Sequence, residues 1–216
     1  MLKALLFDLD GTLAETDSVH HPTWAELLKP HGYDVDWAFF QERMSGRLNP
    51  DIVTELLPNL SEEEGLAMVE AKEADFRERA AALEPLPGLI DFVEWGRERG
   101  LEMALVTNAP RENVLAVLRS LALDEAFDPI ILADDVGVAK PDPAPYAAAL
   151  DALGVEAGEA LAFEDSPSGI ASSIGAGIPT VGVASTQEPG LLGRLGVVLV
   201  VHDFTDPGLR PFVEAS

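Results

Sequence analysis

The sequence contains no cysteine and few basic residues. Without cysteine the chain can form no disulfide, no thiolate nucleophile and no thiolate metal site. Only 14 lysine and arginine side chains stand against 38 acidic ones, which leaves a formal net charge of −24 at pH 7. A chain this acidic lacks the basic surface that displaces counterions from phosphates, so we expect neither a nucleic-acid partner nor a membrane partner.

Long apolar runs are also missing. No stretch approaches the roughly 20 apolar residues that a membrane helix needs. The apolar start of the chain is interrupted by Asp8 and Asp10 and lacks a small-residue cleavage site, which argues against a secretory signal and favours a cytoplasmic protein. Hydrophobic residues still make up 47% of the chain, so we expect a normal folded core beneath the acidity.

Short apolar runs alternate with helix-like stretches over much of the chain. The predicted strands are 3–9, 103–107, 129–132, 161–164, 180–183 and 197–201. The predicted helices are 89–98, 111–121, 143–153 and 168–176. Gly100, Gly154 and Gly177 follow three of these helices, as expected for a helix stop. Strands alternating with helices of about ten residues predict an α/β protein with an open, doubly wound parallel sheet.

Residues 15–85 interrupt this alternation. The region has helical patterns, among them 25–28, 37–44 and 61–83, but no convincing strand. Ser61 followed by Glu64 has the spacing of a helix-capping box. We therefore expect an α-helical domain, residues 15–85, inserted into an α/β core domain that residues 1–14 and 86–216 form.

Polar residues follow four of the predicted strands, in chain order Asp8 and Asp10, Thr107 and Asn108, Lys140, and Glu164 with Asp165. Sites in open parallel sheets form at the carboxyl ends of the strands, so we expect these side chains to meet. A carboxylate nucleophile, a hydroxyl, a cation and an acidic pair together predict a site for phosphate and magnesium.

Four motifs resemble, in order and spacing, those of the haloacid-dehalogenase-like (HAD) superfamily. They are Phe7-Asp8-Leu9-Asp10-Gly11-Thr12-Leu13, Val106-Thr107-Asn108, Lys140-Pro141-Asp142-Pro143 and Phe163-Glu164-Asp165-Ser166 with Gly169. The resemblance spans nearly the whole chain. It implies a HAD-like, Rossmann-like core with an inserted α-helical cap, as in phosphoglycolate phosphatase, sugar phosphatases and β-phosphoglucomutase.

The resemblance implies that Asp8 and Asp10 carry the chemistry. Asp8 would attack phosphorus and form an aspartyl-phosphate, which divides one difficult displacement into two easier ones. Asp10 would give a proton to the leaving alcohol and later accept one from the attacking water. A turn-capping role is the alternative for Asp10.

The remaining motif residues are expected to bind phosphate and metal. Thr107, Asn108 and Lys140 would hold the phosphoryl group as charge develops on it. Mg²⁺ would be held by oxygen ligands, namely the Asp8 carboxylate, the Asp10 backbone carbonyl, Asp165 and, as a direct or outer ligand, Glu164.

Four residues of the inserted region resemble positions in sugar phosphatases and β-phosphoglucomutase, namely Thr16, His20, Arg47 and Lys72. Thr16 and His20 would help to orient Asp10, and the Arg47 guanidinium would suit a second anionic group of the substrate. Simpler alternatives are a helix-start residue for His20, a surface ion-pair partner for Arg47 and a solvated helix charge for Lys72.

The sequence thus predicts a Mg²⁺-dependent phosphatase. Its substrate would be a small phosphorylated metabolite of the sugar-phosphate or phosphoglycolate type. The alternatives are a phosphomutase of the β-phosphoglucomutase type and a non-catalytic phosphate-binding protein on the same fold. The run Asn108 to Asn113 resembles the phosphatases more than the mutase. A monomer is the default expectation, with a dimer left open.

Overall fold

The computed structural model describes residues 1–215, which form two compact units. The first, here called the core unit, consists of Met1–Glu15 and the chain from Leu83 on. The second, the helical unit, is Thr16–Ala82. The backbone N–H of Leu86 donates a hydrogen bond of 2.8 Å to the carbonyl of Leu13, so the chain leaves and re-enters the core unit at neighbouring points. Among the described residues, no helix has the length and apolar character required to cross a membrane.

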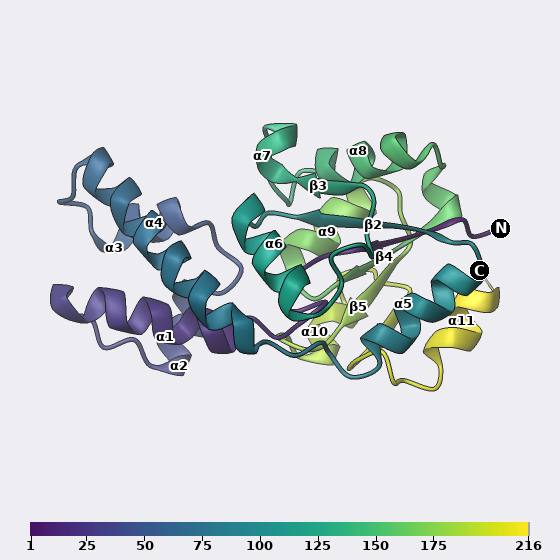
Figure 1. The fold of residues 1–216 in the computed structure, drawn as a ribbon, viewed down its shortest axis with the longest axis horizontal. Coiled ribbons are helices and arrows are strands. Elements are labelled where there is room, and N and C mark those ends of the chain that lie inside the picture. Colours follow the sequence, from purple (N-terminus) through teal and green to yellow (C-terminus); the bar gives the residue numbers. More distant parts are fainter. Residues whose placement is uncertain (216) are drawn as a thin grey trace. The chain divides into compact units, whose positions relative to one another are not determined.

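A six-stranded parallel sheet lies at the centre of the core unit (Figure 1). The strands are β1 (Ala4–Phe7), β2 (Glu102–Thr107), β3 (Ile130–Leu132), β4 (Ala160–Glu164), β5 (Thr180–Val183) and β6 (Leu199–Val201). Their order is β3-β2-β1-β4-β5-β6, and every pairing is parallel. The chain winds outward from β1 in one direction and then in the other, which confirms the predicted doubly wound fold.

Helices cover both faces of this sheet (Figure 1). They are α5 (Leu89–Glu98), α6 (Arg111–Ser120), α7 (Ala133–Val136), α8 (Ala144–Leu153), α9 (Pro167–Gly175), α10 (Pro189–Gly193) and α11 (Leu209–Ala215), with a 3-10 turn, η3 (Ala157–Glu159). The six predicted strands and the four predicted helices of the core are confirmed, with ends shifted by at most two residues. The short helices α7, α10 and α11 were not predicted, because four to seven residues are too few to show a helical period.

The two faces of the sheet have different packing. Successive strand residues point to opposite faces, so Ala4 and Leu6 pack with Tyr146 and other residues of α8 on one face. On the other face the rings of Phe7 and Phe163 stack with centroids 4.9 Å apart, and Phe92 of α5 meets both edge to face. The strands are buried on both sides, as their continuous apolar runs require.

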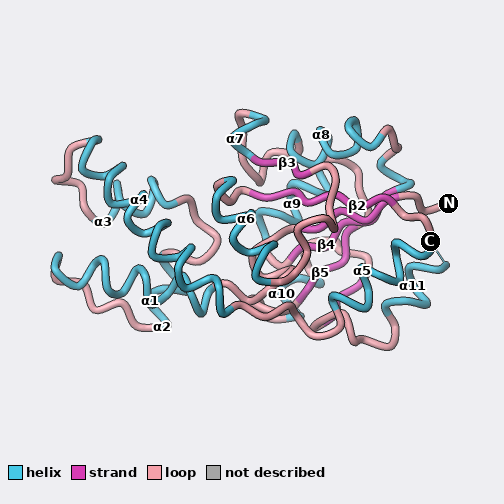
Figure 2. The backbone as a smooth tube through the Cα atoms, viewed as in Figure 1, coloured by secondary structure: helices cyan, strands magenta, loops and turns pink. Residues whose placement is uncertain are grey.

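The helical unit contains helices and loops but no strand (Figure 2). Its helices are α1 (Asp17–Leu28), α2 (Trp37–Arg43), α3 (Asn49–Leu56) and α4 (Glu62–Arg79), with 3-10 turns η1 (Lys29–His31) and η2 (Ala80–Ala82). Trp24, Phe40 and Ile52 contribute to a separate apolar core. The predicted capping box is confirmed, because Ser61 and Glu64 exchange bonds at the start of α4.

Candidate active site

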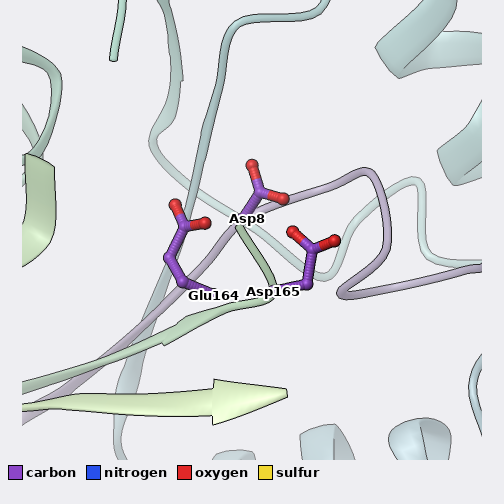
Figure 3. A group of neighbouring side chains, drawn as sticks. All are labelled: Asp8, Glu164 and Asp165. Atoms are coloured by element: carbon purple, nitrogen blue, oxygen red, sulfur yellow. The ribbon is translucent and has the colours of Figure 1, made fainter. Parts of the chain in front are cut away.

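Three buried carboxylates meet at the carboxyl ends of the two central strands. Phe7 of β1 pairs with Phe163 of β4, so the residues that follow, Asp8 and Glu164, are neighbours. Carboxylate oxygens of Asp8, Glu164 and Asp165 lie within 4.8 Å of one another. Figure 3 shows the three side chains extending from the ends of β1 and β4 toward the same side. These three side chains therefore lie close together, as expected from their positions at the strand ends.

Lys140 also contacts this cluster. Among the described residues, its side chain carries the only ammonium group that does so. Its Nζ lies 2.7 Å from Asp8 Oδ1 and 2.6 Å from Glu164 Oε1. It also donates to the carbonyl oxygen of Val106, at 2.7 Å. An ammonium has three protons to donate, so these three contacts use its full capacity.

Burial and mutual repulsion raise the pKa values of Asp8 and Asp165. Burial raises the pKa of Asp8 to about 8, the charge of Glu164 raises it as well, and Lys140 opposes the rise. Burial and the charge of Asp8 raise the pKa of Asp165 well above its ordinary value. Burial alone would lower the pKa of Lys140, but the carboxylates of Asp8 and Glu164 raise it well above its usual range. The lysine therefore stays charged, and the acids exceed it in number.

The cluster suits a divalent cation. Glu164 is completely buried, and its Oε2 has no hydrogen-bond partner. Oxygen donors and surplus negative charge suit a hard cation. Asp8, Glu164 and Asp165 could hold it, and the expectation of a metal ion agrees with this donor set.

Asp10 lies in the turn that follows β1. It forms a bridge with Ala14 and is half-buried. Its charge raises the pKa of both Asp8 and Asp165, which places it near the cluster. Its neighbour Gly11 has φ +75°, and a Cβ there would overlap the Asp165 carboxylate. Only glycine fits this turn beside the cluster.

Thr107 and Asn108 end β2, and their side chains have different partners. The Thr107 hydroxyl oxygen accepts a bond of 3.0 Å from the backbone N–H of Ala109. The Asn108 carboxamide pairs with the backbone of Lys140, accepting from its N–H at 2.9 Å and donating to its carbonyl at 3.3 Å. Asn108 was predicted to bind phosphate. In the structure its side chain bonds to the backbone of Lys140, and the phosphate contact stays a prediction.

Two residues that sequence reasoning missed hold the carboxylates. The Tyr146 hydroxyl donates to Glu164 Oε1 at 2.6 Å, and the Thr186 hydroxyl donates to Asp165 Oδ2. A tyrosine on the apolar face of α8 needs a buried partner for its hydroxyl, and that need is the signal that could have found it. Thr186 lies in a loop far along the chain, and nothing in its neighbourhood of the sequence indicates the contact.

In the helical unit, Lys72 is buried, so the alternative of a solvated helix charge is wrong. Its Nζ lies 2.8 Å from His20 Nδ1 and 3.2 Å from Glu73 Oε1. The rings of Trp24 and Phe76 face it, with centroids at 5.7 Å and 5.4 Å. His20 also stacks on Phe76, so it does more than begin a helix.

Arg47 lies in a surface ion pair, and Thr16 lies at the start of a helix. Arg47 pairs with Glu55 at 2.7 Å, and both side chains are 37% exposed, as the surface ion-pair alternative requires. Arg47 also donates to the carbonyl of Arg43. Thr16 is buried at the N-cap position of α1, and its side chain makes no capping bond.

Comparison with known proteins identifies the family. The model of the haloacid dehalogenase-like hydrolase family matches residues 2–177. The chain belongs to this family. It is 32% identical over 202 residues to validoxylamine A 7'-phosphate phosphatase of Streptomyces hygroscopicus subsp. limoneus, an alignment that covers 92% of this chain and 93% of the relative.

Two further comparisons agree with this haloacid dehalogenase-like assignment. The chain is 31% identical to phosphoglycolate phosphatase of Rhodospirillum rubrum, with 96% of this chain and 90% of the relative covered. Its fold is similar to that of CbbY from Rhodobacter sphaeroides, solved in complex with phosphate, with a TM-score of 0.85, 26% identity and coverage of 96% and 97%. The predicted family, fold and enzyme class, a hydrolase of the phosphatase kind, are thus confirmed.

Proposed function

We propose that this chain is a Mg²⁺-dependent phosphatase of a small phosphorylated metabolite, of the sugar-phosphate or phosphoglycolate type. The observation that carries the proposal is the buried cluster of Asp8, Glu164 and Asp165 with Lys140. Relatives named as phosphatases of phosphorylated small molecules support the substrate class.

In the proposed reaction, the Asp8 carboxylate attacks phosphorus and the bond from phosphorus to the ester oxygen breaks. Asp10 gives its proton to the departing alkoxide, which leaves as the alcohol. Water then attacks the aspartyl-phosphate, Asp10 takes back a proton, and the bond from phosphorus to Asp8 breaks to release phosphate. Each residue thus returns to its starting state.

The surrounding groups neutralise and orient charge. Mg²⁺, held by Asp8, Asp165 and the Asp10 carbonyl with Glu164 beside them, would supply positive charge to the phosphoryl oxygens and reduce the repulsion among the carboxylates. Lys140 already uses its three protons, so it can bind a phosphoryl oxygen only by giving up one of its present partners. The Thr107 hydroxyl is the second proposed phosphate ligand.

We propose that the helical unit acts as a cap that selects the substrate. Its buried Lys72 with His20, and its exposed Arg47, would meet anionic groups of a substrate. Arg47 would have to exchange Glu55 for that ligand. The cytoplasmic location, the monomeric state and the absence of a nucleic-acid partner stay predictions.

Variants of the two catalytic aspartates test the mechanism. Phosphate release is measured across a panel of phosphorylated sugars, phosphoglycolate and nucleotides, with and without Mg²⁺. Asp8→Asn should abolish turnover while the protein stays folded, and Asp10→Asn should accumulate a phosphorylated protein that mass spectrometry detects. Asp151→Asn, an exposed change on α8, is the matched control and should behave as the unmodified enzyme. Full activity of Asp8→Asn would exclude the mechanism.

A separate assay distinguishes the mutase alternative. The protein is incubated with β-glucose 1-phosphate and a trace of glucose 1,6-bisphosphate. Free phosphate as the product supports the hydrolase, and glucose 6-phosphate would show a mutase. A folded protein without either activity on any substrate of the panel would favour a phosphate-binding protein.

A further inference from the structure

Tyr146 contacts both Lys140 and Glu164, which form an ion pair. Its hydroxyl lies 2.6 Å from Glu164 Oε1, and the Lys140 ammonium lies over its ring, 5.1 Å from the centroid. Lys140 donates to that same Glu164 oxygen at 2.6 Å. One carboxylate oxygen therefore accepts two short bonds, one from a cation and one from a phenol.

The Glu164 carboxylate is restricted from its opposite side as well. Its second oxygen, Oε2, accepts no hydrogen bond and packs against Gly169 in the first turn of α9. A Cβ at Gly169 would overlap the carboxylate. Glycine provides the space that Glu164 occupies, and the Tyr146 hydroxyl holds the other end of the group, so the orientation of the carboxylate is fixed.

The position of the tyrosine ring is itself fixed by packing. Tyr146 is fully buried and belongs to the close-packed cluster in which α8 meets small strand residues such as Ala4, Ala104 and Ala162. A buried ring in such a cluster cannot move without opening a cavity. Its hydroxyl therefore donates from a rigid position, as a group that orients a ligand must.

We propose that Tyr146 is a positioning residue of the metal site, whose hydroxyl fixes the Glu164 carboxylate and thereby sets the affinity for a divalent cation. This inference rests on the proposed function, since it assumes that the carboxylate cluster holds the metal. A merely structural tyrosine would contribute to folding but not to metal affinity.

The chain offers a matched pair of substitutions, because it contains only two tyrosines. Tyr33 in the helical unit also donates a 2.6 Å bond, to the carbonyl of Leu56. Tyr146→Phe and Tyr33→Phe each remove one hydroxyl that donates a short bond. Only the first removes a bond to a carboxylate of the cluster.

Calorimetric titration of the metal-free variants with Mn²⁺ tests the proposal. Tyr146→Phe should bind Mn²⁺ about tenfold more weakly, at the lower end of the range for loss of a group that orients a metal ligand. Tyr33→Phe should bind as the unmodified chain does. Equal Mn²⁺ affinity in Tyr146→Phe and the unmodified chain would overturn the proposal. If the unmodified chain binds neither Mn²⁺ nor Mg²⁺, the metal site of the proposed function fails with it.

A second measurement decides the matter if Tyr146→Phe does not fold. In the Tyr33→Phe protein, Tyr146 is the only tyrosine, so labelling with 3-fluorotyrosine places a single fluorine probe beside Glu164. Saturating Mg²⁺ should shift its fluorine resonance, because the hydrogen-bonded carboxylate gains a cation. An unchanged resonance, while calorimetry shows that Mg²⁺ is bound, would overturn the proposal.

Discussion

Lys140 in the core unit and Lys72 in the helical unit are two of the four lysines in the chain, and both are almost completely buried. Lys140 contacts two carboxylates and a carbonyl. Lys72 contacts the Glu73 carboxylate, the His20 imidazole and two aromatic rings.

The two lysines differ in the groups that the structure places beside them. Around Lys140 the acids outnumber the cation, so the cluster keeps a surplus negative charge that a metal ion can neutralise. Lys72 lies beside the Glu73 carboxylate, and the faces of Trp24 and Phe76 further stabilise its ammonium. Both units bury a lysine, but the group of carboxylates that could hold a cation, among the described residues, is the one beside Lys140.

Exchanging each lysine for methionine should reveal the largest difference between the two sites. Lys140→Met leaves Asp8 and Glu164 facing each other without a cation. We expect kcat/KM to fall about 10³-fold and the free energy of unfolding without metal to fall by about 3–5 kcal/mol. Phosphate release and denaturant unfolding measure the two effects.

Lys72→Met is the counterpart in the helical unit. Methionine can fill the space between the rings, and Glu73 retains the side-chain amide of Asn49 as a donor, so the free energy of unfolding should fall by only about 1–3 kcal/mol. Mg²⁺ affinity should not change. A loss of Mg²⁺ affinity as large as that in Lys140→Met would contradict the distinction between the two lysines.

Adding one methyl group next to Glu164 should impair the metal site. The Cβ of Gly169→Ala would displace the carboxylate, so Mg²⁺ affinity should fall about tenfold or more, and overpacking should cost about 1–3 kcal/mol of stability. Calorimetry and thermal unfolding measure these changes. Gly65→Ala in α4 is the control, because its Cβ would meet only a side chain of Val53 at 3.4 Å.

The surplus charge of the core cluster predicts how Mg²⁺ stabilisation depends on pH. The pKa of Asp8 rises on folding to about 8, so in metal-free protein this group supports folding fully below its unfolded pKa and loses that contribution as the pH rises toward 8. In the proposed site, Mg²⁺ would bind the ionised carboxylate. It should therefore raise Tm by a few degrees more at about pH 8.5 than at about pH 6.

Thermal unfolding with and without Mg²⁺ at the two pH values measures that difference. Lys72→Met should show the same dependence on pH as the unmodified chain, since the titrating carboxylate lies in the core unit. A Mg²⁺ shift in Tm that is larger at the lower pH would contradict the proposed cause.

The smallest change concerns the helix that carries Lys72. Ser61→Ala removes the hydroxyl half of the capping box of α4, in which the Ser61 hydroxyl oxygen accepts from Glu64 N–H. The bond of 2.8 Å from the backbone N–H of residue 61 to Glu64 can remain. Stability should fall by about 1 kcal/mol, with kcat unchanged. Denaturant unfolding checks this, and Ser120→Ala, at the end of α6, should have a smaller effect. A fall in kcat beyond twofold would contradict the separation of roles.

The sequence was sufficient to predict the meeting of Asp8, Glu164, Asp165 and Lys140, because parallel strands place their carboxyl ends at one edge of the sheet. The hydrogen-bond partners of individual side chains were harder to predict. The Asn108 amide pairs with a loop that lies 32 residues further along the chain, and Thr186 reaches Asp165 from another loop. Such contacts depend on loop geometry, which follows no short period in the sequence.

Sequence neighbours are also a poor guide to the burial of a charged residue. Lys72 lies in a helix rich in glutamate, and its neighbours in the sequence are typical of a solvent-exposed residue. In the structure, however, the rings of Trp24 and Phe76 pack beside its ammonium group. Helix α3, which begins with Asn49 and Pro50, was not predicted, because eight residues are few for a helical period to be recognised, although Ile52, Val53 and Leu56 are buried. Tertiary packing determined both outcomes.

The hydrogen bond from Leu86 to Leu13 bears on how the inserted helical unit can vary in sequence and length. It joins the two points between which the helical unit is inserted, so β1 and the aspartates after it are held by the core unit itself. Insertions of other lengths can occupy the same place without moving the strand that carries Asp8. If the proposed function holds, substrate preference would diverge through the insertion while the reaction chemistry is retained.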